Sequence, residues 1–178
     1  MIAAASALIA GTASAETIAQ GNGEASVMLG DKKLNIFTYR PTTCEPRRLL
    51  VVFHGLNRDA GPYRDHARTL ADRLCAVVVA PEFDTQRFPT SMYQLGGSTV
   101  ELVAPLVAWA RRAAAQPDMP YILIGHSAGG QFLGRVAAYT IFQLKFNVEY
   151  RSHNCMRVHI YISYLRIKRS FIMHRNFN

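Results

Sequence analysis

A serine flanked by glycines, directly after an apolar run, is the residue of this chain best suited to covalent chemistry. Residues 121–124 read Tyr-Ile-Leu-Ile, and residues 125–129 read Gly-His-Ser-Ala-Gly. In a Gly-x-Ser-x-Gly turn a strand reverses sharply into a helix, and the glycines supply conformations and clearances that a Cβ would block. The serine Oγ is lifted above the sheet edge, and the helix points its N-terminal amides at a developing oxyanion. The pattern therefore predicts that Ser127 is a nucleophile.

The three fixed positions of this motif are a weak signal when taken alone. With glycine near 7% of residues and serine assumed similar, about one chain in twenty of this size would match by chance. The context is stronger, because the preceding run is β-branched and Phe132, Val136 and Thr140 then share one helical face. The alternative is that Ser127 only caps a helix, a position where serine is also favoured.

Two further segments carry the same kind of signal. Residues 53–59 close an apolar run of strand length and continue as His-Gly-Leu-Asn-Arg-Asp, and residues 77–83 read Val-Val-Val-Ala-Pro-Glu-Phe. Together with 125–130, these segments resemble the α/β-hydrolase superfamily, specifically secreted serine esterases similar to polyhydroxybutyrate depolymerases. The resemblance covers roughly residues 24–139. For the His-Gly pair alone, an ordinary strand-to-loop turn is the alternative.

The resemblance implies acyl transfer to water through an acyl-serine intermediate, with a small or polymeric ester or related acyl compound as substrate. Ser127 would be the nucleophile, and the backbone N–H groups of Leu56 and Ala128 would form the oxyanion hole. No cofactor is implied, and the sequence has neither a Cys-His cluster at zinc spacing nor a phosphate-cradling glycine loop. The implied fold class is α/β: a partial α/β-hydrolase fold with a mostly parallel sheet, helices on both faces, and no C-terminal strands.

Hydrophobic periodicity predicts alternating strands and helices, as in a parallel sheet covered on both faces. The expected strands are 25–28, 34–39, 49–53, 75–80 and 121–124, and the expected helices are 63–74, 99–115 and the segment after the elbow. Ligands of such sheets bind beyond the carboxyl ends of the strands. His54, Phe83 and Ser127 stand at these ends, so we expect them to meet in one cleft.

The groups that would activate the serine are the weak point of this interpretation. A serine hydroxyl is almost wholly protonated at neutral pH and needs a positioned base. In the superfamily that the chain resembles, the acid and then the histidine follow the serine along the chain. The candidates downstream are Glu149, His153, His159 and His174. We expect them to be scattered residues of a solvated tail, with the triad lost and activity weak or absent. His126 is expected to point away into packing, and His66 to lie on the surface.

The beginning of the chain is typical of an exported protein. Residues 1–15 are small or apolar and end in Ala-Ser-Ala, as in a secretory signal with its cleavage site, although no Lys or Arg precedes Lys32. We therefore expect a secreted or periplasmic protein whose residues 16–140 form the N-terminal part of a hydrolase domain. An apolar N-terminal helix is the alternative. No later stretch approaches the eighteen or so apolar residues of a membrane span.

The composition changes sharply at Ile141. Residues 141–178 contain no Ala, Gly or Pro, and they hold seven Lys and Arg against one Glu, whereas the charges before them nearly balance. We interpret this segment as a basic tail foreign to the fold, produced by a frameshift, a gene truncation or a mispredicted exon. A divergent natural C-terminus is the alternative. Residues 158–164 alternate with period two, so the tail could add a strand to the sheet edge or form a loose basic helix.

Three cysteines leave one without a partner in an exported chain. Cys44 and Cys75 each precede a strand of the same predicted sheet and could pair in an oxidising compartment, with two buried thiols as the alternative. Cys155 would be left over.

Two rival functions stay open. One is a non-catalytic hydrolase-like binding domain or truncated pseudoenzyme. The other is a binder of nucleic acid or an anionic surface through the basic tail, which we disfavour in view of the balanced charge up to residue 140.

Overall fold

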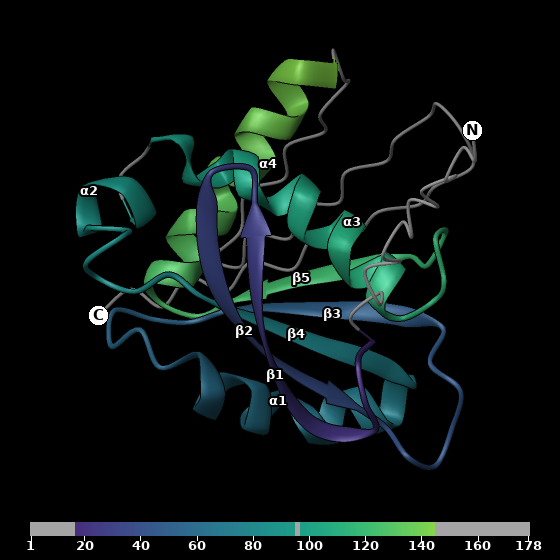
Figure 1. Ribbon diagram of the computed structural model, residues 1–178. Coiled ribbons are helices and arrows are strands. Elements are labelled where there is room, and N and C mark those ends of the chain that lie inside the picture. Colours follow the sequence, from purple (N-terminus) through teal and green to yellow (C-terminus); the bar gives the residue numbers. More distant parts are fainter. Residues whose placement is uncertain (1–16, 95–96, 145–178) are drawn as a thin grey trace, which may run out of the picture.

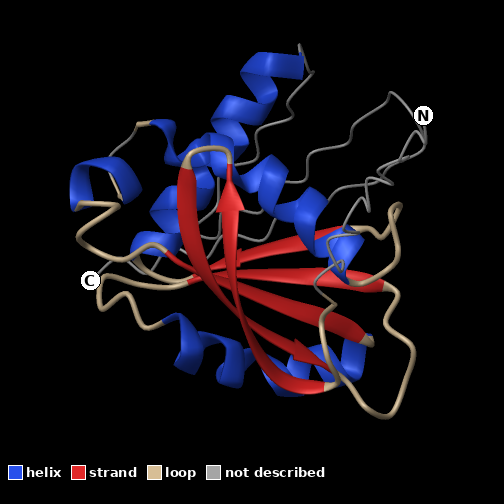
Figure 2. Cartoon of the chain, viewed as in Figure 1, coloured by secondary structure: helices blue, strands red, loops and turns tan. Residues whose placement is uncertain are grey.

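A computed structural model describes residues 17–94 and 97–144. Its five strands form one mixed sheet in the order β1-β2-β4-β3-β5 (Figures 1 and 2). The strands are β1 (Gly21–Leu29), β2 (Lys32–Arg40), β3 (Arg48–Phe53), β4 (Ala76–Glu82) and β5 (Tyr121–Gly125). β3 pairs in parallel with both β4 and β5, while the β1–β2 hairpin joins β4 in antiparallel fashion. The prediction of a mostly parallel α/β sheet, matching part of an α/β-hydrolase fold, is confirmed.

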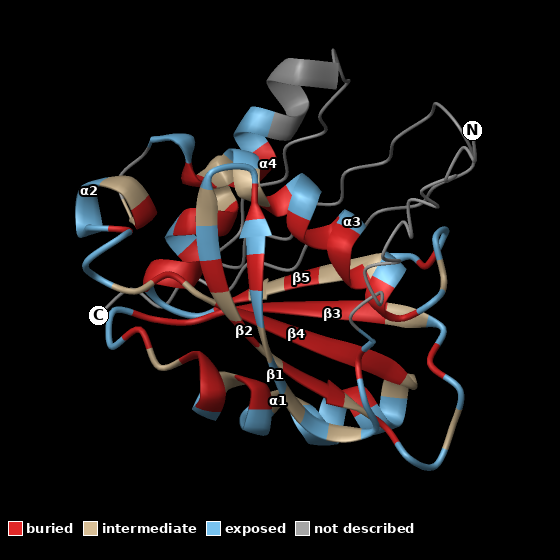
Figure 3. Ribbon diagram, viewed as in Figure 1, coloured by how far each residue is buried: buried red, intermediate tan, exposed pale blue. Residues whose placement is uncertain are grey.

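Helices cover both faces of this sheet. α1 (Ala60–Leu74) lies on one face, whereas α3 (Val103–Ala113) and α4 (Ala128–Leu144) lie on the other (Figure 1). Because successive side chains of a strand point to opposite faces, a strand covered on both sides must be apolar throughout. β3 fulfils this condition at every position after Arg48, and Figure 3 shows nearly all of the strand as buried.

The alternation along β3 divides the core into two layers. Leu49, Val51 and Phe53 join the cluster that α3 and α4 cover. Leu50 and Val52 join the second cluster, which includes Ala60 and Ala71 of α1. The end of β3 is thus fixed between two packed layers, and this rigid position is where the candidate site begins.

The structure corrects the predicted helix over residues 99–115. A 3-10 helix, η1 (Ser98–Leu102), comes first, and the α-helix α3 starts only at Val103. Pro105 has no N–H, so it cannot make the α-helical hydrogen bond to the carbonyl of Glu101. The α-helical ladder therefore cannot extend back through the preceding turn.

Other boundaries also differ from the expected ones. α1 begins three residues before the predicted start at Tyr63, and the short helix α2 (Thr90–Tyr93) was not predicted. β4 begins at Ala76, because Cys75 takes a left-handed conformation (φ 47°) as the C-cap of α1. The predicted signal at 1–15 and the tail strand at 158–164 lie outside the described residues, and so do the side chains from Thr140 onward.

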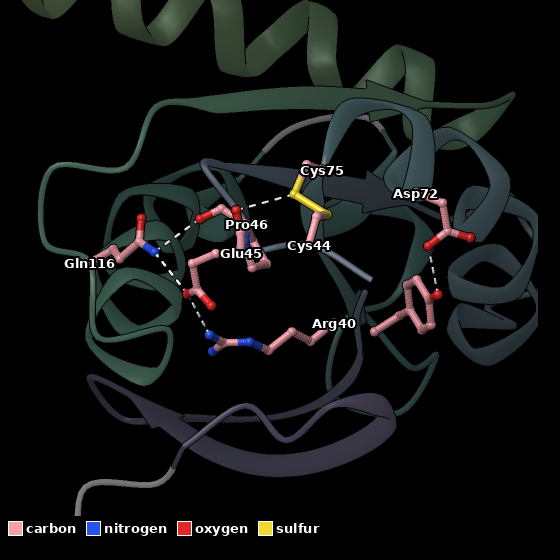
Figure 4. The surroundings of a disulfide bond; sticks show 8 residues. Arg40, Cys44, Glu45, Pro46, Asp72, Cys75 and Gln116 are labelled. Carbon is pink, nitrogen blue, oxygen red and sulfur yellow. Dashed lines mark hydrogen bonds and ion pairs between the residues drawn. A yellow bond between two sulfur atoms is a disulfide. The ribbon is translucent and has the colours of Figure 1, made fainter. Parts of the chain in front are cut away.

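A disulfide joins the connector before β3 to the end of α1. Cys44 and Cys75 are 31 positions apart in the sequence, with their Cα atoms 6.1 Å apart. The neighbouring Glu45 carboxylate accepts hydrogen bonds from Arg40 (2.8 Å) and Gln116 (3.3 Å), as Figure 4 shows. Gln116 also donates to the carbonyl of Pro46 (2.9 Å). The connector is thereby tied to β2 and to the loop before β5.

Removing this disulfide is expected to destabilise the protein by about 2–4 kcal/mol, because the cross-link restricts a loop of the unfolded chain. The double variant Cys44→Ser/Cys75→Ser is compared with the oxidised protein by urea unfolding. Cys155→Ser is the matched control and should leave the free energy of unfolding unchanged. Peptide mapping that found Cys44 and Cys75 as free thiols after export to an oxidising compartment would contradict the pairing.

Within the described ranges, no helix combines the length and apolar character needed to cross a membrane.

Candidate active site

Ser127 occupies the turn between β5 and α4 and is exposed. Its φ is 54°, in the left-handed region that non-glycine residues enter at a cost of about 1–3 kcal/mol. The Gly-x-Ser-x-Gly pattern predicts the special backbone conformation at the flanking glycines, and this prediction is wrong. Neither Gly125 nor Gly129 has a positive φ, so the serine itself carries the strained conformation. Such strain persists only where the surrounding structure holds it in place.

The two glycines are required for clearance. A Cβ on Gly125 would lie 2.3 Å from the carbonyl oxygen of Gly129. A Cβ on Gly129 would lie 2.3 Å from the carbonyl oxygen of Phe53 and 2.7 Å from that of His54. The first turn of α4 therefore packs backbone to backbone against the end of β3. The N–H of His126 also approaches the Phe53 carbonyl at 3.4 Å, which joins the turn before α4 to the same strand end.

His54 braces the loop that follows β3. Its ring is fully buried, and Nε2 accepts a hydrogen bond from the N–H of Phe83 at 2.9 Å. The proton must then be on Nδ1, which donates to the carbonyl of Gly55 at 2.9 Å. Burial lowers the pKa of His54 below its ordinary value, so the neutral form that this network needs is favoured. Tyr93 adds a hydrogen bond from its hydroxyl to the His54 carbonyl at 2.7 Å.

The two predicted oxyanion donors lie in the segments that this packing brings together. In the described part of the chain, the backbone N–H groups of Leu56 and Ala128 have no hydrogen-bond acceptor. Leu56 is about half exposed, at 52%. A Cβ on the preceding Gly55 would lie 3.7 Å from the Cβ of Ser127, so the loop after β3 runs directly past the serine.

Arg58 is a buried residue to which the sequence analysis gave no role. Its Nη1 donates to the carbonyl of Phe83 and, at 3.1 Å, to that of Phe88. The guanidinium lies over the ring of Tyr93, 4.6 Å from its centroid. Arg58 thus joins the loop after β3 to the loop after β4. The only sequence signal was its place in the segment that resembles the hydrolases.

The predicted cleft of three residues needs correction. Ser127 is exposed, but Phe83 is fully buried and contacts Phe53 and Phe132 in the core. His54 is buried as well, so neither residue lines a cleft beside Ser127; both pack in the core under the loops that surround the serine.

His126 was expected to pack inward but is exposed, with Nδ1 2.9 Å from the hydroxyl of Tyr63. His66 lies on the surface, as expected.

Comparison with solved structures identifies the fold. A poly(3-hydroxybutyrate) depolymerase from Bordetella parapertussis aligns at 32% identity and a TM-score of 0.58, over 66% of this chain and 47% of its own. A poly(aspartic acid) hydrolase-1 from a Sphingomonas species aligns at 27% identity and a TM-score of 0.60, over 72% and 53% of the two chains. The chain belongs to the α/β-hydrolase superfamily.

A carboxyl esterase from Bacillus coagulans shares the fold at 22% identity and a TM-score of 0.51, over 68% of this chain and 41% of its own. No protein-family model matches the sequence, and a search of curated proteins also finds no match. The chain spans about half the length of the hydrolase structures to which it is similar.

In the described part of the chain, no residue is placed to take the proton of the Ser127 hydroxyl. Among the described residues, the Ser127 hydroxyl has no hydrogen-bond partner. No group of three or more His, Cys, Asp or Glu side chains that could bind a metal occurs there either. The four downstream candidates lie outside the described residues: Glu149, His153, His159 and His174.

Proposed function

We propose that the protein is a serine hydrolase of the esterase type, exported from the cytoplasm, with Ser127 as nucleophile. The observation that carries the proposal is the exposed serine with a positive φ at a strand-to-helix turn, directly beside the loop that contains Leu56. A nucleophile elbow presents its serine in this way. The similarity to a hydrolase at 32% identity supports the same reaction class.

The proposed reaction begins with attack of the Ser127 Oγ on the carbonyl carbon of an ester or related acyl compound. The carbonyl oxygen becomes an oxyanion, to which the N–H groups of Leu56 and Ala128 would donate. The alkoxide leaves with the proton that the Ser127 hydroxyl gives up, and water then hydrolyses the acyl-serine, releasing the acid and restoring the Ser127 hydroxyl. Two similar structures are named for activity on poly(3-hydroxybutyrate) and poly(aspartic acid), so we include polymeric acyl substrates in the proposal.

We further propose that turnover by this chain is slow, because no described residue is placed as a base for Ser127. Within the described residues the serine hydroxyl has no acceptor for its proton. The oxyanion donors can still stabilise a tetrahedral adduct at Ser127. A single modification of Ser127 by a strong electrophile therefore depends less on a base than repeated turnover of an ester does. No cofactor enters the proposal.

Ser127 is expected to be the most reactive serine of the chain toward a fluorophosphonate probe. Labelling should be slow, because the elbow presents the hydroxyl to the oxyanion donors without a positioned base. Mass spectrometry of the labelled protein identifies the modified residue. Ser127→Ala is the control and should remove the label. An adduct on another serine, or equal labelling of the variant, would show that the turn is not a nucleophile elbow.

A further inference from the structure

Side chains from two separate segments surround the Cα of Gly55, the residue before the Leu56 amide. A Cβ placed on Gly55 would lie 2.9 Å from the hydroxyl oxygen of Tyr63, 3.7 Å from the Cβ of Ser127 and 3.9 Å from Nδ1 of His126. The Tyr63 oxygen and the Ser127 Cβ are therefore separated by no more than the sum of the first two distances. Helix α1 thus brings a phenol hydroxyl to the reactive serine.

The Tyr63 hydroxyl is held in place by His126. Its oxygen lies 2.9 Å from Nδ1 of the imidazole, and the two ring centroids are 6.1 Å apart. When the imidazole proton is on Nδ1, it donates to the phenol oxygen and leaves the phenol O–H free to donate elsewhere. In the other tautomer, Nδ1 accepts from Tyr63. Because His126 is exposed, exchange with water can interconvert the two tautomers without movement of the heavy atoms.

We propose that Tyr63 supplies a third hydrogen bond to the oxyanion formed at Ser127, with His126 as the residue that positions it. The inference rests on the proposed function. The oxyanion would lie beside Gly55, where the Leu56 amide and the Tyr63 hydroxyl are both close. Neither Tyr63 nor His126 gives up a proton: Tyr63 donates its O–H to the oxyanion, and His126 donates from Nδ1 to the Tyr63 oxygen.

Such a bond would act on the rate of reaction more than on binding of the reagent. Charge on the oxygen develops only as the tetrahedral adduct forms, so a donor aimed at it stabilises the transition state more than the ground state. A purely structural role for Tyr63, linking α1 to the elbow, would instead affect stability. These two roles can be separated, because phenylalanine fills the same space without the hydroxyl.

The test measures how a fluorophosphonate inactivates the full chain, with the inactivation rate constant kinact separated from the binding constant KI. Tyr63→Phe is expected to lower kinact about 10-fold and to leave KI within about twofold, because a hydrogen bond to a charged oxygen is worth a factor of about ten or more. Tyr39→Phe is the matched control. Its hydroxyl donates to Asp72 of the same helix at 2.7 Å, in a different place, so kinact should not change.

His126→Phe provides the second arm, which decides the matter if Tyr63→Phe fails to fold. It is expected to lower kinact because the phenol loses the group that orients it, whereas His126→Gln retains a donor and should recover part of the rate. Unchanged kinact in Tyr63→Phe, or a change confined to KI, would overturn the inference and leave the proposed function standing. Absence of any label on Ser127 in the unmodified protein would overturn the proposed function, and the inference with it.

Discussion

The purified chain is expected to hydrolyse a p-nitrophenyl ester about 10⁴- to 10⁶-fold more slowly than a serine hydrolase with a complete triad. The Ser127 hydroxyl must lose its proton as it attacks, and no described residue accepts a hydrogen bond from it. The amides of Leu56 and Ala128 would supply only the modest acceleration that oxyanion donors give without a base. Initial rates at several protein concentrations, corrected for spontaneous hydrolysis, measure this residual activity.

Two variants show whether residual activity belongs to the site. Ser127→Ala removes the nucleophile, and a triple variant changes the three downstream histidines, His153, His159 and His174, to alanine. If no triad forms, the triple variant should match the unmodified chain, whereas Ser127→Ala should lose the small activity that the site supplies. Rapid hydrolysis that both variants abolish would mean that residues 141–178 complete a triad, and that our interpretation of this segment as foreign to the fold is wrong.

The central strands could be predicted because their sequences satisfy two packing constraints at once. β3 is apolar at every position after Arg48, and the structure divides its side chains between two core layers. Only a strand covered on both faces needs such a run. The serine after the strand and the glycine two residues later then locate the turn from β5 to α4, because close backbone packing at Gly129 excludes any side chain.

The details of the backbone could not be predicted from the same patterns. The φ of Ser127 is positive although serine has no intrinsic preference for the left-handed region, so residue propensity and hydrophobic period do not report it. Periodicity also continued smoothly across residues 99–115, although the proline at 105 prevents the α-helical bond to Glu101. The missing N–H of Pro105 thus outweighs the hydrophobic pattern, and that pattern does not show where the α-helix starts.

The roles of individual residues near the site were harder still to infer. His54 and Phe83 follow their strands in the sequence, which suggested a cleft, but tertiary packing buries both and joins them through the Phe83 N–H. The contact between Tyr63 and His126 links residues 63 positions apart. No pattern in a single sequence shows which face of α1 contacts the turn between β5 and α4.

Gly129→Ala is expected to destabilise the protein by about 3 kcal/mol or more and to abolish labelling of Ser127, since overpacking of this severity exceeds the usual cost. The added Cβ would lie 2.3 Å from the carbonyl oxygen of Phe53, far inside van der Waals contact. The Gly129 Cα that would carry this Cβ and the Phe53 carbonyl both belong to backbone that is fixed by other contacts. Phe53 is buried in the core, and Gly129 lies in the first turn of α4. A flexible side chain could rotate away, but here the helix must move from the strand end.

The matched control is the same substitution at Gly61, where a Cβ would lie 3.4 Å from Phe37, an ordinary contact. Gly61 is in α1, so alanine there is expected to raise the free energy of unfolding by up to about 1 kcal/mol through better helix propensity. Urea unfolding and the fluorophosphonate rate are measured for both variants. If Gly129→Ala were as stable as Gly61→Ala and labelled at the normal rate, the close packing of α4 on β3 would not be what positions Ser127. The expected result is loss of labelling in Gly129→Ala even in its folded fraction, because the displaced helix carries the Ala128 amide away from the adduct.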